Sequence, residues 1–275
     1  MNIPKQVERQ TPRRRGDTVN TNSIIITPFP LNDSLQICLE GTGRDWKGIT
    51  AENMLAAVSY AADRGVRELF LPSVSKCNGL VASPYRFGAR EFGSVIVRDG
   101  VSADAVAIGP RSAVAIASAD CPTLVLWSSW VRKAVVGHAS RDSLLRGLVG
   151  NMVRYLHPTS EYRSHIQAFL ALGIGPESFE HRFDHPTHGG RNLQMVHRVS
   201  NVLGFHCFPG PLELGRMDVF RVVEAQLSNL GVSKAHVSSD RHDTFADRLP
   251  DGTPAWHSHR RGDKSRNLVF VHWKG

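Results

Sequence analysis

Residues 113–138 read AVAIASADCPTLVLWSSWVRKAVVGH, and this stretch decides the fold. It contains three short apolar runs, Ala113–Ser118, Thr123–Trp127 and Ala134–Gly137, separated by polar or turn-forming residues. Such runs are typical of strands that are buried on both faces. The stretch therefore predicts the centre of a buried β-sheet.

Helical patterns lie on both sides of this stretch. Thr50 can cap a helix whose apolar face carries Met54, Leu55, Val58 and Ala62, and further amphipathic segments cover 144–156 and 217–230. Additional strands are predicted at 66–71, 94–97, 167–173, 234–238 and 268–272. We expect an α/β (α+β) fold, in which residues 23–275 form a single layered domain with a central mixed β-sheet flanked by helices.

The basic residues of the chain are concentrated at its two ends. The net charge is +8, but residues 1–22 contribute +3 and residues 254–275 contribute +4, which leaves a body close to neutral. This distribution is poor evidence for a nucleic-acid groove, so no nucleic-acid partner is predicted. The polar segment 1–22 is predicted to be a disordered basic tail.

Cysteine usage and hydropathy favour a cytoplasmic protein. Four cysteines (Cys38, Cys77, Cys121 and Cys207) show no disulfide-like spacing, and the basic N-terminal segment is not followed by an apolar core like that of a secretory signal. The sequence has no run of 18 apolar residues, so no membrane span is expected. Its oligomeric state is left open.

Cys121 and His138 are the candidate catalytic residues. Pro122 interrupts hydrogen bonding between strands, which places Cys121 at a bend, and His138 ends the next strand just before a helix. Strand ends beside helix starts are common ligand sites, and a thiol in such a place is expected to have a lowered pKa. Asp120 is expected to point to the opposite face. The plain alternative is a core cysteine and a structural histidine.

Five segments in order resemble conserved blocks of the YfiH-like family, also called the peptidoglycan-editing-factor or laccase-domain family. The first block is 102–122, which begins with SADA and ends with SADCP. The other four are VVGHASRD at 135–142, LGIGPESFE at 172–180, SDRHDT at 239–244 and HSHRR at 257–261. The resemblance covers about residues 45–273. It implies a layered fold distantly similar to Cys/His deamidases.

The resemblance also implies a site and a class of chemistry. In the family, residues matching Cys121 and His138, together with a histidine from an upstream QVHG motif, surround a zinc ion or act on the substrate. The implied activities break C–N bonds, as in purine nucleoside phosphorolysis, adenosine deamination and the removal of wrongly built peptidoglycan precursors. Nothing in the sequence resembles a multicopper ligand set.

The sequence departs from the family pattern at the upstream histidine, because no histidine precedes His138. The family motif aligns either with 75–79, which puts Cys77 or Asn78 in that place, or with 90–93, which puts Phe92 there. We favour the first. It predicts Cys77, Cys121 and His138 as a zinc site with an open fourth position.

Two arginines are candidate substrate-binding residues. Arg141 replaces the family's arginine by a one-residue shift, and Arg260 lies in the last block. Histidines are frequent in the excursion 180–215, but their spacing matches no trusted metal motif.

Three functions remain open. The first is an enzyme, a hydrolase or a phosphorylase-like transferase, that cleaves a C–N bond of a small nucleoside or amide substrate, with or without zinc. The second is a metal-free Cys/His amidohydrolase or deamidase. The third is a non-catalytic binding module that has kept the fold.

Overall fold

The computed structural model describes residues 23–29, 34–48, 50–74 and 76–274. The predicted disordered tail over residues 1–22 lies outside them. In the part of the chain described, no helix is long and apolar enough to cross a membrane.

The strands form two mixed sheets. The first has the order β1-β2-β13-β8-β3-β6-β5, and the second has the order β12-β11-β9-β10-β7-β4. In the first sheet the bounds are β1 Ser23–Ile26, β2 Leu35–Glu40, β3 Glu68–Phe70, β5 Gly88–Phe92, β6 Val95–Asp99, β8 Ser112–Ser118 and β13 Asn267–Trp273. In the second they are β4 Val81–Ala82, β7 Ala105–Ile108, β9 Thr123–Ser128, β10 Lys133–His138, β11 Gln167–Ala171 and β12 Val237–Ser239.

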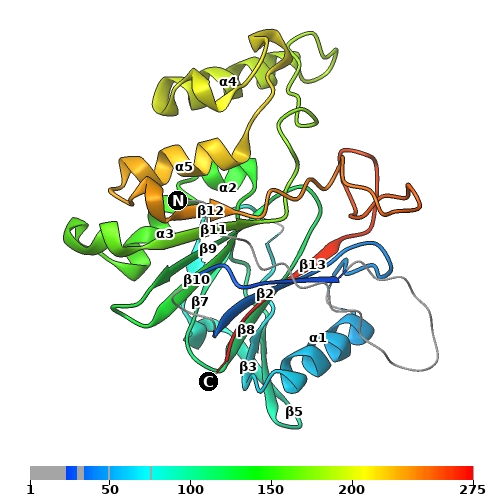
Figure 1. Cartoon of the computed structure of the whole chain (residues 1–275), viewed down its shortest axis with the longest axis vertical. Coiled ribbons are helices and arrows are strands. Elements are labelled where there is room, and N and C mark those ends of the chain that lie inside the picture. The colour runs from blue at the N-terminus through cyan, green and yellow to red at the C-terminus, as the bar shows by residue number, and fades with distance from the viewer. Residues whose placement is uncertain (1–22, 30–33, 49, 75, 275) are drawn as a thin grey trace.

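Helices cover the outer faces of the sheets. α1 (Ala51–Asp63) packs on the first sheet, whereas α3 (Leu148–Leu156), α4 (Gly189–Leu203) and α5 (Val219–Asn229) belong to the core of the second. Figure 1 shows α1 on one side of the strands and α3 and α5 on the other, with α4 beyond α5. The layers therefore run helix, sheet, sheet, helix. A short helix α2 (Arg141–Leu145) and 3-10 turns at Pro84–Arg86, Ser160–His165, Phe205–Cys207, Leu212–Leu214 and Lys234–His236 complete the elements.

Alternating side chains of the central strands supply the core between the sheets. In β8, Val114 and Ile116 face the second sheet, while Ala113 and Ala115 face α1. In β9, Val125 lies between the sheets, and its neighbours along the strand pack on the helices of the opposite side. Because successive side chains of a strand point to opposite faces, an uninterrupted apolar run can pack on two layers at once.

The α/β class with flanking helices is confirmed, but the strands are divided between two sheets where we expected one. A buried apolar run reveals that both faces of a strand are covered, and it does not reveal whether a helix or another sheet covers them. Strands that follow one another along the chain therefore fall into different sheets, as β8 and β9 do.

Two helical predictions also needed correction. The segment 144–156 is not one helix, because Gly147 adopts a left-handed conformation (φ 83°) and separates α2 from α3. The excursion 180–215 contains the 15-residue helix α4, which we did not predict. Only a narrow face of α4 is buried, through Met195, Val196 and Val199, and the histidines and glycines around it hide that pattern in the sequence.

The N-terminal cap of α1 allows a direct test. The Thr50 hydroxyl accepts a hydrogen bond from the Asn53 main-chain N–H at 3.1 Å. We expect Thr50→Ala to lower the free energy of unfolding by about 1 kcal/mol, because this N–H loses its partner. Chemical unfolding would measure the change, and Thr50→Ser should preserve wild-type stability. Equal losses in both variants would show that the hydroxyl does not act as a cap.

Candidate functional site

Pairing of strands β7 and β10 places an acid beside His138. Gly137 pairs with Ala105, and the His138 main-chain N–H donates to the carbonyl of Asp104 at 2.7 Å. The Asp104 carboxylate in turn accepts a hydrogen bond from the Gly79 N–H at 2.5 Å, which fixes the loop that carries Cys77. Three segments far apart in the sequence therefore meet at one point.

One potential ligand atom from each of Cys77, Asp104 and His138 lies within 4.8 Å of the other two. Among the described residues, no other group of three or more histidine, cysteine, aspartate or glutamate side chains meets this condition. Cysteine sulfur, carboxylate oxygen and imidazole nitrogen all bind divalent transition metals. The cluster is a candidate metal centre.

Two polar atoms of this cluster are buried without a hydrogen-bond partner. They are His138 Nδ1 and Asp104 Oδ1. Burial and the nearby positive charge of Arg266 lower the pKa of His138 to about 4, so its ring is neutral at pH 7. Burial also raises the pKa of Asp104, despite the opposing hydrogen bond from Gly79. Since buried polar atoms are nearly always paired, these two atoms fit a bound cation.

Cys121 lies in the bend between β8 and β9 and lines the same cavity as Cys77 and His138. The Ser118 hydroxyl donates to the Cys121 carbonyl at 2.7 Å and closes the bend. Desolvation by burial, with smaller contributions from Asp120 and Cys77, raises the pKa of the Cys121 thiol to about 12. The expected low-pKa thiol is therefore not found, because desolvation outweighs the nearby cation Arg141.

The Asp120 carboxylate holds together two loops of the site. Its Oδ1 accepts from the Thr244 hydroxyl at 2.8 Å, and its Oδ2 accepts from the Arg260 main-chain N–H at 2.7 Å. Both oxygens are thus hydrogen-bonded away from His138. Asp120 nevertheless lines the same cavity as Cys121 and His138, so the expectation that it points to the opposite face is not confirmed.

A cavity of about 650 Å³ joins the predicted site residues. Cys77, Cys121, His138 and Arg141 all line it. Phe92, the alternative match to the family histidine, is not part of the wall. The structure therefore brings Cys77 to the site through the loop that follows β3.

Arg141 and Arg260 differ in position. Arg141 is the first residue of α2, lines the cavity and forms an ion pair with Asp142 at 3.1 Å. Arg260 does not line the cavity; its guanidinium donates to the Glu180 carbonyl at 2.6 Å and lies 5.7 Å from the centre of the Phe179 ring. Because Phe179 is a wall residue, Arg260 supports the cavity from behind it.

Asp104 was not among the site residues that the sequence predicted. The only signal was a single acid in the segment SADA, immediately before an apolar strand. Its proximity to His138 depends on the antiparallel pairing of β7 with β10, and the sequence did not predict β7.

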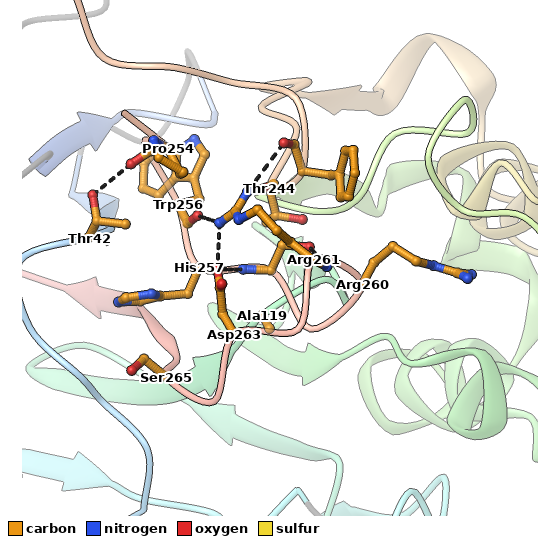
Figure 2. A network of polar contacts seen from close by, with 12 residues as sticks. Thr42, Ala119, Thr244, Pro254, Trp256, His257, Arg260, Arg261, Asp263 and Ser265 are labelled. Atoms are coloured by element: carbon orange, nitrogen blue, oxygen red, sulfur yellow. Dashed lines mark hydrogen bonds and ion pairs between the residues drawn. The ribbon is translucent and has the colours of Figure 1, made fainter. Parts of the chain in front are cut away.

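Arg261 organises the loop that borders the cavity. Its guanidinium donates to the carbonyls of Thr244, Phe245 and Trp256 and pairs with the Asp263 carboxylate. Figure 2 shows Arg261 between these groups, while the side chain of Arg260 points away from them. Such a set of charge-assisted hydrogen bonds fixes loop geometry more firmly than an exposed ion pair does.

Fold and site together define a layered α/β protein with a cysteine–histidine cavity and a candidate metal centre. Residues 88–273 match the family model described as "Multi-copper polyphenol oxidoreductase laccase". The chain belongs to this family, the YfiH-like family that its sequence blocks resemble.

Solved structures share the fold. YfiH from Bacillus licheniformis is 12% identical with a TM-score of 0.68, and the match covers 92% of this chain and 96% of that one. A DUF152 protein from Neisseria meningitidis is 16% identical with a TM-score of 0.67 and coverage of 92% and 100%. YlmD from Geobacillus stearothermophilus is 17% identical with a TM-score of 0.62 and coverage of 99% and 100%. No curated protein matches the sequence.

The copper chemistry in the family description does not fit this site. Multicopper and blue-copper centres require several histidine ligands, whereas the cluster contains a single histidine, His138. A mixed set of sulfur, oxygen and nitrogen ligands fits one divalent ion instead.

The Arg261 network allows a stability test. We expect Arg261→Ala to lower the free energy of unfolding by about 2–3 kcal/mol, because Asp263 and three carbonyls lose charged donors. Arg248→Ala is the control, since that exposed side chain bonds only to nearby carbonyls, and its effect should stay within about 0.5 kcal/mol. Chemical unfolding compares the variants, and equal effects would contradict a special role for Arg261.

Asp263 adds a prediction of pH dependence. Partial desolvation alone would raise its pKa, but hydrogen bonds from the Ser258 N–H and Arg261 hold the pKa below the ordinary 3.8. A depressed folded-state pKa contributes stability above 3.8, and this contribution is lost as the pH falls through the folded-state value. Asp263→Asn should therefore destabilise the protein at pH 7, with a gap to wild type that narrows below pH 3.8. Urea unfolding across this range measures the gap, and a constant gap would contradict the assignment.

Proposed function

We propose that the protein is a cytoplasmic enzyme that cleaves a C–N bond of a small nucleoside or amide substrate in the Cys121/His138 cavity, with a zinc ion held at its candidate metal centre. One observation carries the proposal: buried His138 Nδ1 and Asp104 Oδ1 have no hydrogen-bond partner in a cluster that also contains Cys77. Membership of the YfiH-like family supports the choice of C–N chemistry.

Cys77, Asp104 and His138 would hold the ion. Once bound, zinc supplies Lewis acidity, which polarises a substrate oxygen or lowers the pKa of water. Three protein ligands and an open position are typical of catalytic zinc sites. Asp104 would take the place of the family's missing histidine, while Cys121 would be free to face the substrate.

The other residues bind and orient the substrate. In a hydrolytic reaction the water oxygen joins the carbon and a proton goes to the leaving nitrogen. Cys121 would contact the reacting group from the bend between β8 and β9, and Arg141 offers a positive charge at the wall. Asp120 keeps the loops at Thr244 and Arg260 against the site through its two hydrogen bonds.

The metal-free alternative is less well supported. A nucleophilic cysteine works as the thiolate, and burial of Cys121 favours the neutral thiol. The non-catalytic alternative would leave His138 Nδ1 and Asp104 Oδ1 buried without any partner, which is costly. A bound cation would give both of these atoms a partner.

Metal content of tag-free protein tests the proposal. We expect one zinc per wild-type chain by mass spectrometry, and its loss in Cys77→Ala, Asp104→Asn and His138→Ala, because each change removes a ligand. Cys207→Ala is the matched control, since this thiol is buried in the core of the second sheet and should leave zinc in place. Wild-type protein without metal would refute the zinc centre.

The variant Cys121→Ala distinguishes between two possible sets of metal ligands. If Cys77, Asp104 and His138 hold the ion, this variant keeps zinc and loses cleavage of nucleosides and amides. If Cys77, Cys121 and His138 hold it, zinc is lost as well. Retained cleavage without the Cys121 thiol would contradict its catalytic role.

A further inference from the structure

The cavity extends from the Cys/His cluster to the layer between α1 and the first sheet. Met54 and Ala57 from α1, Leu71 after β3, Ala115 from β8 and Leu268 from β13 line this part. Ala57 and Leu268 are each only 2% exposed and belong to the apolar core under α1. Apolar ligand atoms placed here would leave water, which contributes roughly 25 cal/mol per Å².

The charged groups in the wall are mainly basic. Lys47, Arg141 and Arg266 line the cavity, against one acid, Asp120. Both oxygens of Asp120 already accept hydrogen bonds from other protein groups.

Arg266 is a half-buried basic residue of this wall. Its guanidinium donates to the carbonyls of Asp263, Lys264 and Ser265, and within the described chain it forms no ion pair. The neighbouring Asp45 carboxylate accepts from the main-chain N–H groups of Lys47 and Arg266 and lies outside the cavity wall. A half-buried cation without a carboxylate partner favours an anionic ligand group.

We propose that the ligand of this cavity is an amphipathic carboxylate, an N-acyl amino acid whose acyl chain lies under α1. The scissile C–N bond is then its amide, an assignment that rests on the proposed function. Hydrolysis breaks the amide C–N bond, places the water oxygen on the acyl carbon and transfers a proton to the amine. The products are a fatty acid and a free amino acid.

Calorimetric titration of wild-type protein with N-butanoyl-, N-hexanoyl- and N-octanoylglycine tests the ligand class. We expect the dissociation constant to fall about fourfold per added methylene, the value for full burial. Octanoylglycinamide lacks the carboxylate and should bind at least about tenfold more weakly. A dissociation constant that does not change with chain length, or does not change when the carboxylate is removed, would overturn the proposal.

Matched variants locate the two parts of the ligand. Arg266→Gln should remove most of the preference for octanoylglycine over its amide, whereas Lys264→Gln, an exposed basic neighbour outside the wall, should retain it. Ala57→Leu should abolish the dependence on chain length by filling the apolar part, with thermal unfolding as the check on folding. If that variant does not fold, Ala117→Val at the half-buried end of β8 gives the same test.

Product release distinguishes this inference from the proposed function. Octanoate and glycine are measured by mass spectrometry after incubation of octanoylglycine with the protein as isolated and with added zinc chloride. If the affinity depends on chain length and on the carboxylate but neither product is released, the ligand class is supported and the proposed cleavage is contradicted. If both products are released by the wild-type protein and not by Cys121→Ala, both the ligand class and the proposed cleavage are supported.

Discussion

The apolar layer between the two sheets is the constraint on which the rest of the structure depends. Val114 and Ile116 of β8 pack there with Val125 of β9 and Val136 of β10, all of them almost fully buried. Burial of these side chains fixes which face of each strand points inward, because a one-residue slip would turn the whole set outward. The ends of β8 and β10, where Cys121 and His138 lie, are thereby fixed as well.

Site chemistry follows from this rigid frame. The register of β7 with β10 holds a buried carboxyl group beside a buried, neutral imidazole, and neither has a full set of hydrogen-bond partners. Such an arrangement is costly for a fold to maintain unless a ligand completes it. Burial disfavours the charged forms of both side chains. It therefore lowers the pKa of His138 and raises the pKa of Cys121.

The family description and the residues of this site indicate different metal chemistry. The family description mentions several coppers, yet the candidate ligand cluster of this chain, Cys77, Asp104 and His138, contains one histidine. Such a mixed set of sulfur, oxygen and nitrogen ligands can hold one divalent metal ion. The fold alone does not determine the chemistry, which has to be argued from the residues present.

Sequence patterns alone were enough to predict the α/β class, most of the central strands, the capped helix at Thr50 and the candidate pair Cys121 and His138. These features depend on local periodicity, on turn and cap chemistry, or on motif blocks, all of which are contained in short stretches of chain. The folded structure was needed to show that the strands divide into two sheets, that Asp104 lies beside His138 and Cys77, and that Arg260 supports the cavity wall instead of lining it. Each of these outcomes depends on pairing or packing between segments far apart in the sequence, for which local patterns carry no information.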